Sequence, residues 1–184
     1  MYTNEQDEAF YEMIWAIIET DEFKKMREYK HHIYGNTYEH SIRVAYLCFL
    51  HYHRFQSKVN LEELVRGALL HDYFLYNRHD KSQKEHVNGL IHGFTHPRKA
   101  LNNALAAYPD LTNNEQDMIA RHMFPLTPLP PKTRYGWMVC FYDKVSAIAE
   151  YCNKIGAESE TVLYRVKYIT NSSKNVEDME TAKE

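Results

Sequence analysis

The chain of 184 residues has 44% hydrophobic and 26% charged residues, which are typical values for a globular domain with a sizeable buried core. Its formal net charge of -3 gives no reason to expect a nucleic acid polymer or a membrane as the partner. Three cysteines without a CxxC pair argue against a disulfide framework and indicate reduced thiols in a cytoplasmic protein. The acidic N-terminus lacks an apolar run typical of a signal peptide, which agrees with that location.

Helical periodicity dominates the sequence, and no alternating run of β-branched residues is long enough to predict a strand. The sequence therefore predicts an all-α fold, a helical bundle in a single domain over residues 1–170. Residues 171–184 are polar and are expected to form a flexible C-terminal tail. In chain order, helices are expected near residues 4–20, 21–29, 37–55, 61–74, 97–107, 113–124, 134–155 and 163–167.

Capping patterns, in which the first side chain accepts from the backbone of the fourth residue, define several helix starts. They are Thr3-x-x-Gln6, Asn36-x-x-Glu39, Asn60-x-x-Glu63 and Thr112-x-x-Glu115. Pro97 fits the first turn of its helix, which would place His96 at or near the cap. The prolines of the segment FPLTPLPPKTRYG (residues 124–136) predict a stiff, extended connection.

The stretch GALLHDYF (residues 67–74) places His71 and Asp72 side by side in apolar helical sequence. Burial of an ionised carboxylate without a partner is costly. A nearby group or ion must therefore supply an opposite charge or hydrogen bonds to His71 and Asp72. Asp143 raises the same question in WMVCFYDKVSAIAE. The histidines in comparable places are His40, His96 and His122. Imidazole and carboxylate groups can satisfy one another by sharing divalent metal ions, and helical bundles build such sites from facing helices.

The order of these residues, His40, then His71-Asp72, then Asp143, resembles the HD-domain metal-dependent phosphohydrolase superfamily, whose signature is H...HD...D. The similarity covers roughly residues 36–150. LLHDYF resembles the family's apolar run into the HD pair, and YDKVSA resembles its closing aspartate helix. The resemblance implies an HD-domain helical bundle that binds metal.

Two further histidines, His96 in THPRKA and His122 in IARHMF, occupy the intervening places of the binuclear pattern H...HD...H...H...D. The chain thus resembles the binuclear branches, which include cyclic-dinucleotide phosphodiesterases and a bacterial diadenosine tetraphosphate hydrolase group. His92 is an alternative ligand, although HP followed by Ala100 matches the family pattern better. The glycine-tyrosine-proline signature of the best-known cyclic-di-GMP phosphodiesterases is missing, which argues against that substrate.

The resemblance implies a phosphohydrolase that cleaves a phosphomonoester, phosphodiester or phosphoanhydride bond, with metal-activated water as the nucleophile. The implied partner is a small phosphorylated substrate similar to a nucleotide. The implied cofactor is a divalent transition metal, as two ions of Fe, Mn, Zn or Ni, with Mg as a further option.

The resemblance also assigns roles to individual residues. His40 and His71 would bind one ion and His96 and His122 the other, with Asp72 as the bridge and Asp143 completing the shell. The expected catalytic residues are Asp72 and Lys144. Lys144 and Arg98 are the expected substrate contacts, with Lys99 and Lys81 as further options, since each could neutralise an anionic group.

Other interpretations stay open at this point. A lone buried histidine is more often a hydrogen-bonded core residue than a ligand, and a surface base usually belongs to a solvated helix face. His51 shares a helix face with His40 and could orient it. A non-catalytic HD-type module that binds a nucleotide or metal, and a di-iron HD oxygenase, are the alternative functions. The sequence leaves the oligomeric state open, with a homo-oligomer as one option, and assigns substrate specificity to residues 76–88 and the proline-rich connection.

Overall fold

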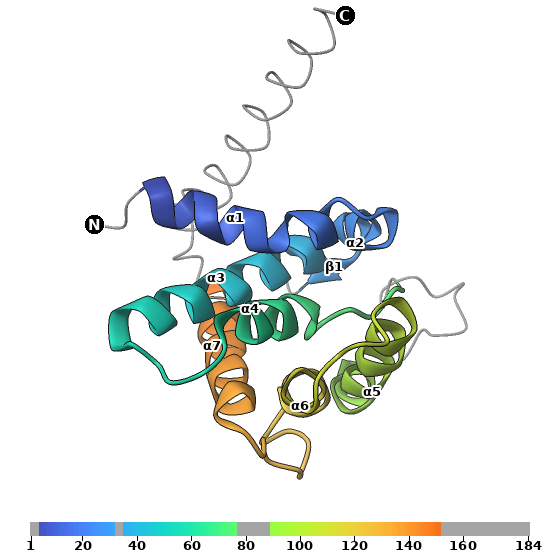
Figure 1. Cartoon of the computed structure of the whole chain (residues 1–184). Helices are drawn as coiled ribbons and strands as arrows, with labels where there is room; N and C mark the ends of the chain where they lie inside the picture. The colour runs from blue at the N-terminus through green and yellow to red at the C-terminus, as the bar shows by residue number, and fades with distance from the viewer. Residues whose placement is uncertain (1–3, 32–34, 77–88, 152–184) are drawn as a thin grey trace, which may run out of the picture.

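The structure is a computed structural model that describes residues 4–31, 35–76 and 89–151 (Figure 1). Its helices are α1 (Asn4–Ile18), α2 (Asp21–Lys25), the 3-10 helix η1 (Met26–Glu28), α3 (Thr37–Phe55), α4 (Leu61–Leu70), α5 (Gly89–Ala107), α6 (Asn113–Arg121) and α7 (Arg134–Tyr151). Within these ranges, β1 (Lys30–His31) and β2 (Gly35–Asn36) form one short antiparallel pair. The predicted all-α fold is confirmed.

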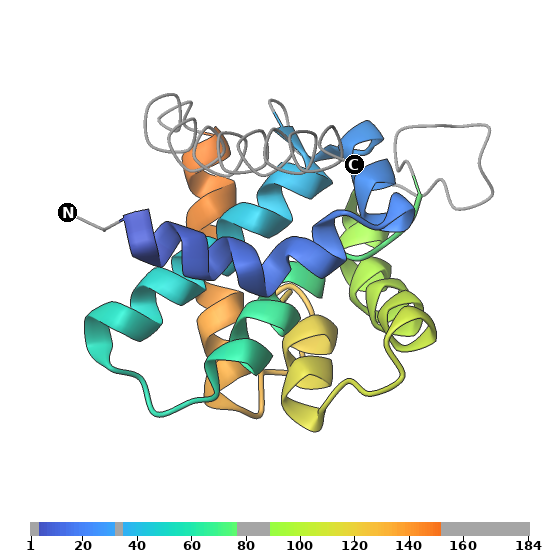
Figure 2. The ribbon, with the colours of Figure 1, turned by 45° about the horizontal axis from the view of Figure 1, so that its top comes forward.

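Helix α4 lies at the centre of the bundle and packs against α1, α3 and α6. Figure 1 shows α1 on one side of α4, with α5 and α6 on the other. Figure 2 shows α1 crossing in front of the bundle. Helix α7 contacts both α3 and α6. The end of α4 is therefore surrounded by elements that come from distant parts of the chain.

The core between α1 and α3 follows from the apolar stripe of α1. Phe10, Ile14 and Ile18 are buried, and they share one helix face because their spacing is four residues. The ring of Phe10 contacts the rings of Tyr46 and Phe49, with centroids 5.1 and 5.3 Å apart. This packing holds α3 in place and so fixes the backbone that carries His40.

The predicted helix caps are confirmed at three starts. The side chain of Asn36 accepts from the Glu39 amide at 2.8 Å, and that of Asn60 accepts from the Glu63 amide at 3.0 Å. Thr112 and Glu115 form a reciprocal capping box. The expected cap at Thr3 lies outside the described residues, as do the expected helix at 163–167, the tail at 171–184 and Lys81.

Two helix boundaries were predicted wrongly. Helix α4 ends at Leu70, so His71 is its C-cap and Asp72 follows it, rather than both lying inside a helix. Helix α5 begins at Gly89, so Pro97 lies inside it and not in its first turn. In the turn before Pro97, the Thr95 hydroxyl donates to the Ile91 carbonyl at 2.9 Å. Pro97 itself has no amide hydrogen to donate, so α5 continues past it without one backbone hydrogen bond.

The proline-rich segment 124–136 is also not an extended connection. Its first part forms turns, in which the Thr127 amide donates to the Met123 carbonyl at 3.1 Å. Its second part is anchored on α6, because the Asp117 carboxylate accepts from the amides of Lys132 and Thr133, at 2.9 and 3.0 Å. The segment therefore folds back against α6 before α7 begins.

Within the described ranges, no helix combines the length and the apolar character that crossing a membrane requires.

Candidate metal centre

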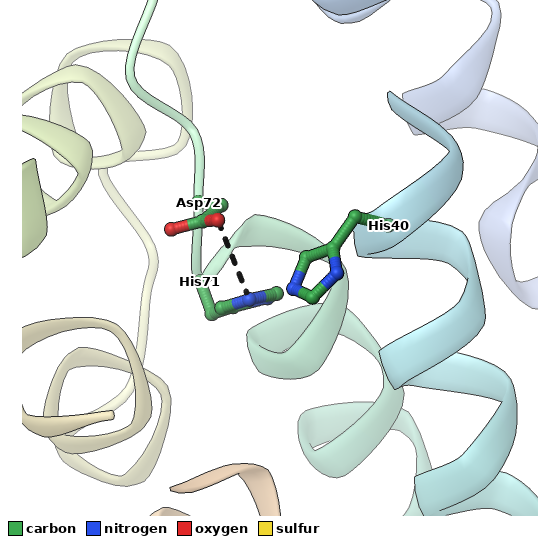
Figure 3. A group of neighbouring side chains, drawn as sticks. All are labelled: His40, His71 and Asp72. Atoms are coloured by element: carbon green, nitrogen blue, oxygen red, sulfur yellow. Dashed lines mark ion pairs between the residues drawn. The ribbon is translucent and has the colours of Figure 1, made fainter. Parts of the chain in front are cut away.

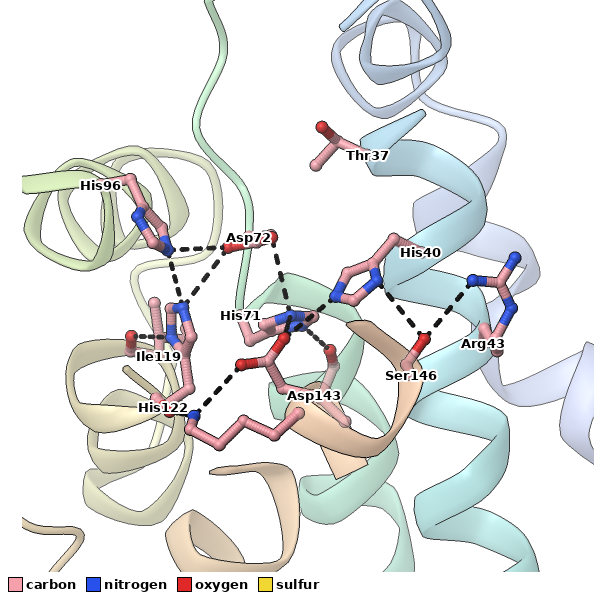
Figure 4. Close-up of polar contacts among 12 residues, drawn as sticks. Thr37, His40, Arg43, His71, Asp72, His96, Ile119, His122, Asp143 and Ser146 are labelled. Atoms are coloured by element: carbon pink, nitrogen blue, oxygen red, sulfur yellow. Dashed lines mark hydrogen bonds and ion pairs between the residues drawn. The ribbon is translucent and has the colours of Figure 1, made fainter. Parts of the chain in front are cut away.

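All six predicted ligands are buried and lie close together at the end of α4 (Figure 4). His40 comes from α3, His71 and Asp72 from the end of α4, His96 from α5, His122 from the C-cap of α6, and Asp143 from α7. Their convergence depends on tertiary packing, since they come from five separate elements. The C-terminal ends of α4 and α6 both point their partial negative charge at this place, which favours a cation there.

His71 is held in one orientation by its own helix. Its Nδ1 donates to the Ala68 carbonyl at 2.7 Å, so Nε2 carries the lone pair when the ring is neutral. Burial lowers the pKa of His71 to about 3, and the ring is therefore neutral at pH 7. Its buried Nε2 has no hydrogen-bond partner among the described residues.

The surroundings of His71 Nε2 consist of further acceptors. Asp72 Oδ2 and Asp143 Oδ1 both lie 3.8 Å from it. Because His71 is neutral, these distances do not describe ion pairs. A lone pair and two carboxylate oxygens that face a common point are the donor set of a divalent cation. The residues therefore fit a metal ion better than they fit one another. Figure 3 shows His71 between Asp72 and His40.

His96 and His122 are oriented in the same way as His71. Their Nδ1 atoms donate to the carbonyls of His92 and Ile119, at 3.0 and 2.9 Å. A carbonyl oxygen can only accept, so the Nε2 atom of each neutral ring carries a lone pair. Both Nε2 atoms face Asp72 Oδ1, at distances of 3.1 Å from His96 and 3.4 Å from His122. This is the arrangement of histidines that bind a metal through Nε2.

His40 differs from the other three because both of its ring nitrogens face carboxylates. Its Nε2 lies 3.1 Å from Asp143 Oδ1 and its Nδ1 lies 2.9 Å from Glu150 Oε1. Burial would lower the pKa of His40, but the hydrogen bonds to Asp143 and Glu150 raise it to about 9. For Asp143, burial is outweighed by the hydrogen bond from His40 and by the nearby imidazoles, so its pKa lies well below the usual range.

Asp72 stands between two groups of ligands. One group contains His40, His71 and Asp72, and the other contains Asp72, His96 and His122; in each, the ligand atoms lie within 4.8 Å of one another. The Oδ2 atom of Asp72 faces His71, whereas Oδ1 faces His96 and His122. A carboxylate with one oxygen toward each group has the geometry of a bridging ligand.

The predicted substrate-binding bases lie in different places. Lys144 is beside the centre, because its Nζ donates to the His122 carbonyl at 2.6 Å and lies 3.4 Å from Asp143 Oδ2. Arg98 is exposed on α5, and a step of two residues from His96 turns a helical side chain onto the opposite face. Lys99 lies on the same side of α5 as His96, with its Nζ 4.4 Å from the centroid of the Tyr76 ring.

His92, the alternative ligand, is buried but supports His96 instead of replacing it. Its carbonyl accepts from His96, its ring stacks on that of His96 with centroids 4.7 Å apart, and its Nδ1 shares a hydrogen bond with the Tyr76 hydroxyl at 2.9 Å. His51, expected as a possible orienting residue for His40, instead bonds the Tyr142 hydroxyl at 2.8 Å.

Sequence reasoning missed the residues that hold His40. Glu150 bonds its Nδ1, and Arg43 in turn bonds Glu150. Ser146 lies between them, 3.4 Å from both His40 Nδ1 and Arg43 Nη1. The spacing of Asp143 and Glu150, seven residues apart and so on one face of α7, was the available signal.

Comparison with known proteins agrees with this geometry. The sequence profile of the HD domain matches residues 37–148, more than half of the chain. No curated protein and no solved structure matches the chain significantly. The matched segment contains all six residues of the centre. The chain therefore belongs to the HD domain family, which consists largely of metal-dependent hydrolases.

Proposed function

We propose that the protein is a metal-dependent phosphohydrolase that cleaves a phosphomonoester, phosphodiester or phosphoanhydride bond of a small, nucleotide-like substrate. The observation that carries the proposal is the sharing of Asp72 by two buried groups of ligands. Membership of the HD domain family supports hydrolysis as the reaction. The buried lone pair of His71 Nε2 supports a metal ion as the cofactor.

Two divalent ions would be held by these residues, one by His40, His71, Asp72 and Asp143 and the other by Asp72, His96 and His122. Such a pair, when bound, lowers the pKa of a water molecule and stabilises charge on phosphoryl oxygens. The protein supplies the orientation of the ligands, since backbone carbonyls fix the rings of three of the histidines.

Lys144 is the base best placed to bind a phosphoryl group of the substrate. Its ammonium lies near both Asp143 and the end of α6, and the side chain is 35% exposed. The Lys144 side chain is therefore exposed to solvent on one side and borders the metal centre on the other. Lys99 is a second option on the α5 side, whereas the position of Arg98 gives no support for its predicted contact.

The test is an activity panel with chelator-treated protein reloaded with Mn²⁺, Fe²⁺, Zn²⁺, Ni²⁺ or Mg²⁺. The substrates are phosphomonoesters, phosphodiesters and dinucleoside polyphosphates. We expect hydrolysis of at least one class that depends on added metal and is absent from Asp72→Ala. Tight binding without hydrolysis would favour a regulatory module. Dioxygen consumption with a polyol, without phosphate release, would favour a di-iron oxygenase.

A further inference from the structure

The four histidines of the centre are not held alike. His71, His96 and His122 each donate from Nδ1 to a neutral backbone carbonyl within their own helix or turn. His40 on α3 instead points its Nδ1 at the carboxylate of Glu150 on α7, at 2.9 Å. A carboxylate partner increases the electron density of an imidazole more than a carbonyl does, and so strengthens the opposite nitrogen as a metal ligand.

Glu150 is itself firmly placed. It is buried, and a charge in that position requires a partner. Arg43, one turn after His40 on α3, bonds Glu150 Oε1 through Nη1. The hydroxyl of Ser146 lies 3.5 Å from the same oxygen. His40 and Arg43 thus converge from one helix on one carboxylate of another.

Helix α7 therefore places a carboxylate beside each ring nitrogen of His40. Asp143 Oδ1 lies 3.1 Å from Nε2, and Glu150 Oε1 lies 2.9 Å from Nδ1. The two carboxylates are seven residues apart, two helical turns, and so lie on one face. Because Nδ1 is hydrogen-bonded to Glu150, Nε2 is the ring nitrogen that is available to bind a metal ion. Figure 4 shows His40 between Asp143 and the pair formed by Ser146 and Arg43.

We propose that Glu150, held by Arg43, is a positioning residue that fixes the tautomer of His40 and makes the ion site of His40, His71, Asp72 and Asp143 the tighter of the two. This inference rests on the proposed function. Among the residues that the structure describes, the other ion site has one carboxylate, Asp72, and the Nδ1 atoms of its two histidines donate to backbone carbonyls. The second carboxylate of the His40 site, Asp143, and the hydrogen bond of Glu150 to His40 Nδ1 both strengthen the binding of a divalent cation there.

A purely structural role is the competing explanation, because a buried pair of Arg43 and Glu150 also fastens α3 to α7. The two explanations differ in what they predict for metal affinity. A fastening pair affects stability, whereas a positioning residue affects one ion site and leaves the other unchanged. Glu115 with Arg66 offers a matched control, since it is also a buried carboxylate paired with an arginine, with Oε2 at 2.9 Å from Nη2.

The experiment measures the affinity of the full chain for Co²⁺ by absorption spectroscopy, with competition by a chelator. The variants are Glu150→Ala, Glu150→Gln and the control Glu115→Gln. We expect two affinities in the wild type and a loss of about 10- to 100-fold in the tighter one for Glu150→Ala. Glu150→Gln keeps the hydrogen-bond acceptor but not the charge, so its loss should be smaller. Glu115→Gln should change neither affinity.

A second readout is the tautomer of His40 in metal-loaded protein, measured by ¹⁵N NMR. We expect a proton fixed on Nδ1 in the wild type and loss of this signature in Glu150→Ala. If Glu150→Ala does not fold, Glu150→Gln, which has nearly the same shape, decides the question. No Co²⁺ binding by the wild type would overturn the proposed function and this inference together. Two ions in the wild type with both affinities unchanged in the Glu150 variants would overturn this inference alone.

Discussion

The Nε2 atoms of His96 and His122 lie 2.8 Å apart. Both rings already donate from Nδ1 to a carbonyl, so neither neutral ring has a proton at Nε2 to share. Two lone pairs at this separation repel each other unless a cation lies beside them. Asp72 Oδ1 faces the same point, 3.1 Å from His96. The two Nε2 atoms and Asp72 Oδ1 are all acceptors when the rings are neutral, so none can donate a hydrogen bond to another. A proton or a metal ion between them would satisfy all three.

The first prediction concerns this half of the centre. His96→Ala and His122→Ala should each reduce the bound ions from two to one, because each removes a ligand that the His40 group does not contain. Turnover should fall by at least about 100-fold, since even the loss of a residue behind a ligand costs 10- to 100-fold. Metal content by mass spectrometry and the rate of phosphate release are the measurements.

His92→Ala is the control for the histidine variants. It keeps the backbone carbonyl that holds His96, so it should retain two ions with only a modest loss of activity. Retention of both ions in His96→Ala, together with loss of one in His92→Ala, would show that the ligand had been assigned to the wrong histidine.

The second prediction distinguishes the two carboxylates of the centre. Asp72→Ala should lose both ions, because Asp72 belongs to both groups of ligands. Asp143→Ala should lose only the ion next to His40 and His71, to which Asp143 is near. Equilibrium dialysis gives the ion content, and circular dichroism should show unchanged helical content in both variants. An Asp72→Ala protein that still binds two ions would disprove the bridging role.

The third prediction concerns the contact between α4 and α6, which sets the separation of His71 from His122. A Cβ atom at Gly67 would collide with the side chain of Met118 and lie 3.3 Å from the Cα of Glu115. Methionine can move aside, but the backbone of α6 must shift. Gly67→Val should therefore lower the free energy of unfolding by about 1 to 3 kcal/mol.

Urea denaturation measures this effect, with Glu62→Ala, an exposed change on the same helix, as the control. The Gly67→Val protein should also bind metal more weakly, because His71 and His122, the C-cap residues of α4 and α6, move apart. Unchanged stability in Gly67→Val would mean that α4 and α6 do not approach as closely as described.

The fourth prediction is a pH dependence at Cys48, which is buried in the core. Burial raises the pKa of its thiol well above the usual value, and only the thiolate reacts with an alkylating reagent. Folded protein should therefore leave Cys48 unmodified by iodoacetamide at pH 8 and even at pH 9.5, where an ordinary thiol is mostly ionised. Unfolded protein should react at once. Peptide mass spectrometry measures the modification, and rapid labelling of folded protein would contradict the packing of α3.

The sequence was sufficient to predict the helical fold and to identify a set of histidines and aspartates that the structure buries close together, because an ionisable residue within an apolar stretch can be recognised from the sequence alone. His71-Asp72 and Asp143 stood out for this reason. The prediction that these residues lie close together did not depend on where each helix ends. The wrong end predicted for α4 therefore left that prediction unchanged.

The supporting residues could not be predicted in the same way. The shared face of α3 predicts His51 as the residue that orients His40, yet it is Glu150 on α7 that lies 2.9 Å from His40 Nδ1. Which helix lies beside His40 depends on how α3 and α7 pack, and helix periodicity carries no information about that. Likewise, the hydrogen bond from His96 to the His92 carbonyl depends on α5 beginning before Pro97, which the sequence did not predict.

The most direct test of the two-ion centre is an anomalous diffraction measurement on crystals of Mn²⁺-loaded protein. We expect two anomalous peaks about 3.5 to 4 Å apart, one beside His40 and His71 and the other beside His96 and His122, with a carboxylate oxygen of Asp72 directed at each. A single peak, or no peak between these residues at saturating Mn²⁺, would contradict the central claim.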